Sequence, residues 1–189
     1  MTARIAQALA LLAAALAIQL WAPPARASDT IEAREIRLEA SVTDGWVLSA
    51  DFELPLSGQI EDAVSRGVAL YFVVEFELLR PRWFWWPEKV SASSRTYRLS
   101  YHALTRQYRI SLEGLGWSYA TLDQALGSLG HLRGWQVLTA EQVTPGATYD
   151  AQLRMRLDLS RLPKPFQVTA IANRDWNLQA EWKRFKFNP

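Results

Sequence analysis

Residues 149–159 read YDAQLRMRLDL, and every second side chain in this stretch is apolar. The apolar positions run from Tyr149 to Leu159, with charged or amide side chains between them. Side chains on a β-strand point alternately to opposite faces, so this pattern predicts a strand with one buried face and one face in water. Such a strand is typical of an antiparallel sheet, because the strands of a parallel sheet are buried on both faces.

The same alternation recurs through most of the chain. It occurs in residues 36–42, 46–54, 70–78, 97–101, 108–112 and 176–182, with shorter candidates at 135–143 and 166–171. Matching the apolar faces of the first two segments requires an odd-length loop, Thr43–Gly45, in which Gly45 adopts the left-handed conformation. Eight or nine strands, each with one wet face, predict an all-β fold: an antiparallel immunoglobulin-like β-sandwich.

Two short helices are expected to dock on this sandwich. The first spans residues 57–67 and begins with the capping residue Ser57. The second begins with a capping box at Thr121–Gln124 and continues to a stop at Gly134, which puts His131 in its last turn. Helices of about ten residues are not stable alone, so each must pack against the sheets.

Residues 1–27 have the features of a secretory signal peptide. An early cation, Arg4, precedes the apolar run 5–20, and the small-x-small sequence Ala25-Arg26-Ala27 follows. We expect cleavage after Ala27, which leaves residues 28–189 as a single β-sandwich domain in the periplasm. The alternative is a retained membrane anchor, although the run is shorter than the ~20 residues of a spanning helix.

The charge of the expected mature chain is balanced. Removal of Arg4 and Arg26 leaves 19 basic and 19 acidic residues, so the formal charge of +2 is no evidence for nucleic-acid binding. Residues 28–77 hold eleven acidic and three basic side chains, whereas residues 78–189 hold eight and sixteen. Neighbouring strands from the two parts can pair these charges, and a bipolar surface that recruits a charged partner is the alternative.

Several catalytic classes lack the residues they need. The chain has no Cys, which excludes disulfides, thiolate nucleophiles, Cys-ligated zinc and iron–sulfur clusters, and its two His exclude a His-rich metal cage. We expect no metal, no cofactor and no catalytic residue. Glu75 and Glu77 share a strand face about 7 Å apart, as a glycosidase pair would, but outward Glu on a strand is usually solvated or paired with Arg.

The aromatic run Trp83-Phe84-Trp85-Trp86 stands between two prolines, Pro81 and Pro87. Proline is confined to strand ends, edges and loops, so the run is expected at a strand end or in a hairpin loop. In one interpretation Trp83 and Trp85 cap the open end of the sandwich. In the other the segment is a binding surface for a protein, since Trp and Arg are typical of docking surfaces. Its expected contact residues are Arg80, Arg82, Trp83, Trp85 and Trp86. Sugar stacking and contact with lipid headgroups are alternatives for the same surface.

Tyr101, His102 and Arg106 form a second candidate patch, at the turn between residues 97–101 and 108–112. Catalysis by His102 as a general base would need an oriented nucleophile, and the chain contains neither a Gly-x-Ser-x-Gly elbow nor a Ser-x-x-Lys motif. We therefore expect His102 to stabilise the turn.

Several motifs together suggest a family. They are the exported N-terminus, the helix at 122–132, Trp83–Trp86, Tyr101–Tyr108, Leu157–Pro163, and Asp175-Trp176 with a closing Trp182. In this order they resemble a bacterial exported family catalogued as domain of unknown function 4390, also labelled proline-rich signal-peptide proteins. The resemblance covers essentially the whole expected mature chain. It implies a proteobacterial envelope protein and, through genomic proximity to a nitrogen-regulation-type membrane sensor kinase, a periplasmic accessory role. It supplies no catalytic residue.

These features predict a non-catalytic periplasmic binding or accessory module of the bacterial cell envelope. Its expected partner is an envelope or membrane protein, with the sensor kinase as a candidate, and no nucleic acid is expected. The alternatives are a cell-wall or carbohydrate-active hydrolase and a protein that binds the membrane surface.

Overall fold

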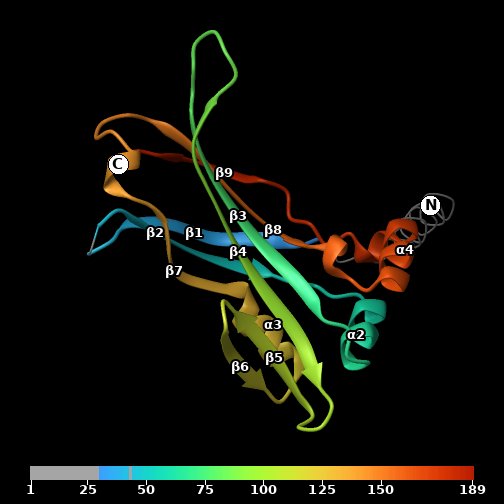
Figure 1. The fold of residues 1–189 in the computed structure, drawn as a ribbon. Helices are drawn as coiled ribbons and strands as arrows, with labels where there is room; N and C mark the ends of the chain where they lie inside the picture. Colours follow the sequence, from blue (N-terminus) through green and yellow to red (C-terminus); the bar gives the residue numbers. More distant parts are fainter. Residues whose placement is uncertain (1–29, 43) are drawn as a thin grey trace, which may run out of the picture.

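The computed structural model describes residues 30–42 and 44–189. The predicted signal peptide, residues 1–27, and the loop residue Thr43 lie outside the described residues. The described chain consists mostly of β-strands in two antiparallel sheets, together with three α-helices (Figure 1). None of the helices in this part of the chain is long and apolar enough to cross a membrane.

Nine strands are present in the described residues, within the predicted eight or nine, although they are not all the predicted segments. They are β1 (Glu32–Ala40), β2 (Trp46–Glu53), β3 (Leu70–Arg80), β4 (Glu88–His102), β5 (Gln107–Leu112), β6 (Leu115–Tyr119), β7 (His131–Leu138), β8 (Tyr149–Leu157) and β9 (Lys183–Phe187). The helices are α2 (Gly58–Ser65), α3 (Leu122–Gly130) and α4 (Lys164–Ala172), and short 3-10 turns are η1 (Ala140–Gln142), η2 (Leu159–Arg161) and η3 (Arg174–Trp176).

The strands form a smaller and a larger sheet. The smaller sheet has the order β1-β2-β7, and the larger has the order β6-β5-β4-β3-β8-β9. Every strand pair is antiparallel, as expected from strands with one wet face. In Figure 1 the long β3–β4 hairpin crosses the molecule, and one of its ends stands clear of the other elements.

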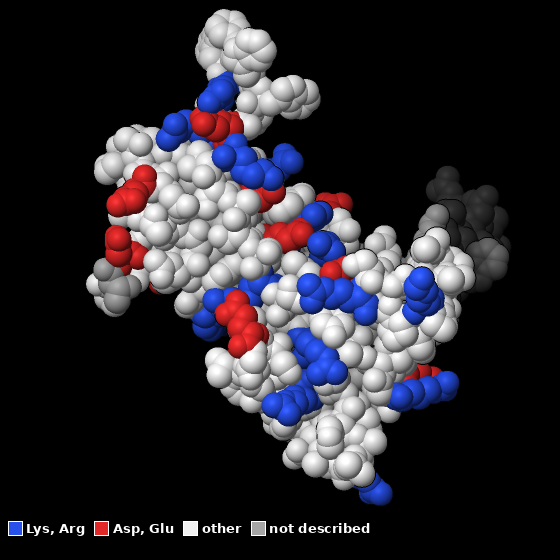
Figure 2. Space-filling view, viewed as in Figure 1, with Lys and Arg blue, Asp and Glu red and all other residues white. Residues whose placement is uncertain are grey.

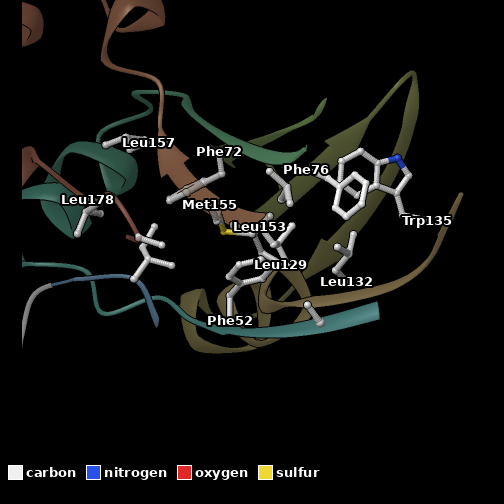
Figure 3. Packing of buried hydrophobic residues seen from close by; sticks show 14 of the residues in the cluster. Phe52, Phe72, Phe76, Leu129, Leu132, Trp135, Leu153, Met155, Leu157 and Leu178 are labelled. Atoms are coloured by element: carbon white, nitrogen blue, oxygen red, sulfur yellow. The ribbon is translucent and has the colours of Figure 1, made fainter. Parts of the chain in front are cut away.

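One hydrophobic core joins the two sheets. Figure 3 shows Phe52 of β2 below Phe72 and Met155 of the larger sheet, and Trp135 of β7 next to Phe76. All five side chains are buried, and α3 contributes Leu129 to the same cluster. Burying this apolar surface against both sheets is what holds the layers together.

The central strands follow the predicted alternation closely. In β3 the even positions from Leu70 to Leu78 are fully buried, and in β8 the odd positions from Tyr149 to Leu157 face the same core. The pattern continued in the sequence to Leu159, but β8 ends at Leu157 and Leu159 begins η2. The larger sheet is therefore centred on two neighbouring strands, and their register, with Phe76 opposite Leu153, places apolar side chains next to one another.

The β1–β2 hairpin has the predicted register. Leu38 lies opposite Leu48 and Ala40 opposite Trp46, so even positions face even positions across an odd-length loop. Gly45 has a φ of +86°, as expected for a turn that needs the left-handed conformation. The strand ends earlier than predicted, however, and Val42 is fully exposed in the loop.

The second predicted helix is shorter than the sequence suggested. Helix α3 ends at Gly130, and the chain then forms β7, which pairs with β2. Gly130 lies so close to β2 that an added Cβ would be 2.4 Å from the Phe52 carbonyl oxygen. Pairing with β2 replaces the next helical turn, so His131 is the first residue of a strand, and Gly134, with a φ of +60°, lies at a bulge in it.

The candidate strand at residues 166–171 was wrong, because this segment lies in helix α4. Pro163 precedes the helix and Pro165 lies in its first turn, where proline fixes a helical φ and no intrahelical N–H is lost. The apolar side chains that suggested a strand include Val168 and Ile171, and both are exposed. The described chain thus has three α-helices, where two were predicted.

The predicted strand at residues 176–182 has the expected alternation of burial without forming a ladder. Trp176, Leu178 and Ala180 are buried, but a single bridge, between Gln179 and Arg156, ties this segment to β8. The ladder to β8 begins later, at Lys183 in β9. Strand β6 and the first part of β4 were not predicted. Strand β6 has apolar residues at alternate positions, but it is only five residues long and mostly exposed, and the first part of β4 is rich in Ser and charged residues.

Candidate functional site

The aromatic run lies at the tip of the β3–β4 hairpin. Arg80 of β3 pairs with Glu88 of β4, and residues 81–87 form the loop beyond this last pair. Figure 1 shows this loop at the end of the β3–β4 hairpin, where the hairpin extends beyond the other strands. We call residues 81–87 the aromatic tip.

The four aromatic side chains of the tip are among the most exposed in the molecule. The exposed fraction is 89% for Trp83, 83% for Phe84, 78% for Trp85 and 90% for Trp86. In Figure 2 the tip is a projecting group of uncharged atoms, separated from the body by a band of positive and negative side chains. The interpretation in which Trp83 and Trp85 cap the sandwich is therefore wrong, because the core ends at Leu78.

Local sequence explains why the strands stop where they do. Pro81 and Pro87 have no backbone N–H to donate across the hairpin, so the ladder cannot continue past the Arg80–Glu88 pair. A register shift at Leu78/Leu79 leaves Val90 as an extra residue in β4. A bulge of this kind increases the local twist and turns the tip away from the plane of the sheet.

The base of the hairpin is held by polar contacts to the neighbouring strand β8. The Arg80 guanidinium donates a hydrogen bond of 3.2 Å to the Tyr149 hydroxyl and lies 5.5 Å from the centroid of that ring. This hydrogen bond lowers the pKa of Tyr149, although burial opposes the shift. We call the last two residue pairs of the hairpin, residues 79–80 and 88–89, its neck. Arg82 contacts Glu88 of the neck at 2.6 Å.

Lys89 contacts Glu77 of β3 at 2.5 Å, and Gln152 of β8 donates to the same carboxylate at 2.7 Å. The neck is therefore cross-linked on both faces. A tip built on an anchored neck of this kind projects in a defined direction.

The predicted docking residues have two different environments. Trp83, Trp85 and Trp86 are free at the tip, whereas Arg80 and Arg82 are engaged at the neck, through Tyr149 and Glu88 respectively. Phe84 belongs to the exposed set and was not among the predicted contact residues, although it lies within the same run. Its ring is paired with Trp83 in an edge-to-face arrangement, with centroids 5.7 Å apart.

The second candidate patch lies at the far end of the same hairpin strand. Strand β4 begins next to the aromatic tip and ends at His102, which places the two patches about 45 Å apart for a strand of this length. His102 Nδ1 is 3.2 Å from the Thr105 hydroxyl, a contact within the turn, as predicted for a structural histidine. Tyr101 packs on Tyr108 with ring centroids 4.9 Å apart, and Arg106 is exposed with a φ of +54°. No small ligand can bridge the two patches.

Glu75 and Glu77 are engaged in ion pairs on the outer face of the larger sheet. Glu75 accepts hydrogen bonds from Arg154 at 2.5 Å and from Arg156 at 2.9 Å. Burial favours the neutral carboxyl, but these two arginines outweigh it and lower the pKa of Glu75. Lys89 and Gln152 do the same for Glu77. A glycosidase acid needs a raised pKa, so this pair has the opposite electrostatics.

Charge pairing between the acidic and basic parts of the chain occurs as the sequence suggested. Asp51 of β2 contacts Arg133 and His131 of β7, each at 2.6 Å, and Glu75 contacts arginines of β8. Burial disfavours the Asp51 carboxylate, yet the hydrogen bonds from His131 and Arg133 lower its pKa. In the described residues, no three acidic or histidine side chains are grouped as a metal ion would require.

Two antiparallel sheets over one core, with an exposed aromatic hairpin tip, define a β-rich protein whose most distinctive surface feature is this tip. The chain belongs to the family described as Domain of unknown function (DUF4390), whose model matches residues 28–186. This agrees with the resemblance seen in the sequence motifs. No curated protein and no solved structure matches the chain.

Proposed function

We propose that this chain is a non-catalytic binding module of the bacterial cell envelope, which attaches to the envelope through the aromatic tip. The observation that carries this proposal is the exposure of four consecutive aromatic side chains, 78–90% each, on a hairpin that has no packing role for them. Large exposed apolar patches are costly in water and mark interaction sites.

The anchoring of the neck supports a binding role. Arg80 ties the hairpin to Tyr149 of β8, and Lys89 joins the two hairpin strands through Glu77. The tip therefore already has a fixed orientation before it meets a partner. Preorganisation of this kind lowers the entropic cost of binding. A flexible loop without these contacts would lose more freedom on attachment.

A hydrolytic function has less support. The carboxylates that share a strand face, Glu75 and Glu77, have lowered pKa values and are held by cations. With Arg154 and Trp182 they line a hollow of only about 220 Å³. Carboxylates in this state do not act as general acids near neutral pH.

The remaining parts of the proposal concern fold type and location. We take the two packed sheets to be a variant of the immunoglobulin-like sandwich, supported by the purely antiparallel pairing and the single shared core. The signal-like sequence of residues 1–27 supports export to the periplasm. An accessory role beside a membrane sensor kinase, which the family resemblance implies, is compatible with attachment at the membrane.

The experiment is a fractionation of cells that express the full chain. We expect the wild-type chain to be retained with the envelope membranes, and the double variant Trp83→Ala with Trp85→Ala to be released into the soluble periplasmic fraction. Ile171→Ala, which removes an exposed apolar side chain from α4, is the matched control and should behave as wild type. Equal retention of the wild type and the double variant would overturn the proposal.

Crosslinking of the same cells adds a second measurement. The wild-type chain and Leu104→Ala, an exposed position in the turn of the second patch, should give the same crosslinked species, which the tip variant should lose. Loss of these species from Leu104→Ala instead would assign attachment to the second patch. Sequencing of the mature N-terminus would test cleavage after Ala27.

A further inference from the structure

We propose that the aromatic tip inserts into the interfacial region of a phospholipid bilayer, so that its binding partner is the membrane itself. This inference rests on the proposed function and specifies the chemistry that the tip recognises. The strongest alternative partner is an apolar pocket on an envelope protein. Four features of the tip favour the bilayer.

The first feature is the direction of the rings. The loop bends at residues 83–86, and all four consecutive side chains from Trp83 to Trp86 are at least 78% exposed, so rings are uncovered on more than one side of the loop. A pocket on another protein would cover the rings on one side and leave the others in water. A bilayer surrounds an inserted tip on all sides and can cover every ring.

The second feature is the chemistry of the side chains. Three of the four are Trp, the residue that concentrates at membrane interfaces because its ring is apolar and its N–H is polar. In the described structure the indole N–H groups of Trp83, Trp85 and Trp86 donate no hydrogen bond to the protein. Lipid phosphate and carbonyl oxygens are acceptors at the depth where these groups would lie.

The third feature is the size of the tip. The loop has three residues on each arm beyond the Arg80–Glu88 pair, which gives a reach of about 10 Å. Interfacial segments bury their apolar side to about 5–10 Å below the headgroup boundary. No backbone hydrogen bond joins residues within 81–87, so these peptide groups need the polar interface and cannot enter the hydrocarbon core.

The fourth feature is the charged band behind the aromatic rings. Arg80, Arg82 and Lys89 surround the neck, with Glu88 and Glu77 between them. In Figure 2 this band separates the tip from the body. With the rings inserted, these side chains would lie at the level of the lipid phosphates, and their partial neutralisation predicts a modest preference for anionic lipid.

The experiment is flotation of the purified mature chain with lipid vesicles. The vesicles consist of phosphatidylcholine alone or of phosphatidylcholine with about one third phosphatidylglycerol. We expect binding to both, a few-fold stronger to the anionic vesicles, and binding that persists in high salt because the rings supply most of the affinity. Each Trp→Ala change should lower the partition coefficient by about 10-fold, whereas Trp→Phe should lower it less. The control Ile171→Ala should bind as wild type.

Brominated lipids provide a second readout. They should quench part of the Trp fluorescence of the wild-type mature chain but not that of the variant Trp83→Ala/Trp85→Ala/Trp86→Ala, whose five remaining Trp residues lie outside the tip. Equal unfolding midpoints would show that the variant is folded. Inorganic phosphate should not compete with the vesicles.

The outcomes separate the two proposals. If the wild-type chain fails to bind vesicles while envelope retention still depends on the tip, the membrane inference is overturned and the proposed function stands with a protein partner. Vesicle binding that survives loss of the three Trp residues, or that disappears in moderate salt, also overturns the inference. If neither vesicle binding nor envelope retention depends on the tip, both proposals fail.

Discussion

The Arg80 guanidinium spans the boundary between the projecting hairpin and the body of the molecule, because it donates a 3.2 Å hydrogen bond to the hydroxyl of Tyr149 on β8. The same hydroxyl accepts a 2.9 Å bond from the backbone N–H of Thr144. Tyr149 is fully buried, so a single side chain joins the neck of the hairpin, the core and the loop before β8. Tyr149 thus ties the base of the exposed tip to the hydrophobic core.

Replacement of Tyr149 by Phe tests this coupling. The ring is kept, but Arg80 loses its acceptor and the Thr144 amide is left without a partner. We expect the free energy of unfolding to fall by about 1–3 kcal/mol, the usual cost of removing one member of a buried hydrogen-bonded set. Urea unfolding followed by circular dichroism measures this. Tyr101→Phe, at a half-buried ring whose hydroxyl makes no such bonds in the described structure, is the control, and equal stabilities of the two variants would contradict the assignment.

The Glu75 ion pairs make stability depend on pH. The pKa of Glu75 is lowered in the folded chain, so the pairs with Arg154 and Arg156 stabilise fully above the unfolded-state value of about 4.3 and are lost as the pH falls through the lower folded value. Glu75→Gln should therefore cost about 1–3 kcal/mol at pH 7 and flatten the fall in stability below about pH 5. Urea unfolding at several pH values checks both effects.

Glu61→Gln is the control for this pH series, because Glu61 on α2 forms no ion pair in the described residues. It should cost much less stability at pH 7 than Glu75→Gln. Asp51 and Glu77 also have lowered pKa values, so some acid sensitivity will remain in Glu75→Gln. An unchanged slope in Glu75→Gln would show that this carboxylate contributes nothing to acid unfolding.

The sequence correctly predicted the strands in which the alternation of apolar residues matches the alternation of buried side chains. Strands β3 and β8 lie in the middle of the larger sheet, where one face is the core, and Gly45 occupies a turn that only a few residue types tolerate. Both signals are local, so they could be read from neighbouring residues. The end of α3 could not, because it is set by the approach of Gly130 to the Phe52 carbonyl on a strand far away in sequence.

The sequence identified the aromatic residues of the candidate site, but it did not show whether their side chains are buried or exposed. Two prolines beside the run from Trp83 to Trp86 placed it in a loop, yet the sequence allowed these rings either to cap the core or to face the surroundings. The choice between the two depends on how far β3 and β4 extend beyond the hydrophobic core. Strand length reflects tertiary packing, and the polar first part of β4 gave no regular repeat from which to predict it.

Gly130 should be intolerant of any side chain. A Cβ atom at this position would lie 2.4 Å from the Phe52 carbonyl oxygen, and backbone cannot move aside without disturbing the β2–β7 pairing. We expect Gly130→Ala to destabilise the fold by about 2 kcal/mol or more. Gly127→Ala, three residues earlier in the same helix, meets open space and should stabilise by up to about 1 kcal/mol. Thermal unfolding of both variants tests the contrast, and similar midpoints would contradict it.

The two predicted helix caps differ in a way that mutation can detect. The Thr121 hydroxyl accepts a 3.3 Å hydrogen bond from the Gln124 amide, whereas the Ser57 hydroxyl is buried and has no hydrogen-bond partner in the described structure. Thr121→Ala should therefore cost about 1 kcal/mol, the ordinary value of a cap. Ser57→Ala removes an unsatisfied polar atom and should be neutral or slightly stabilising. Chemical unfolding of the two variants decides the matter, because a loss of about 1 kcal/mol in Ser57→Ala would mean that the hydroxyl has a partner in solution.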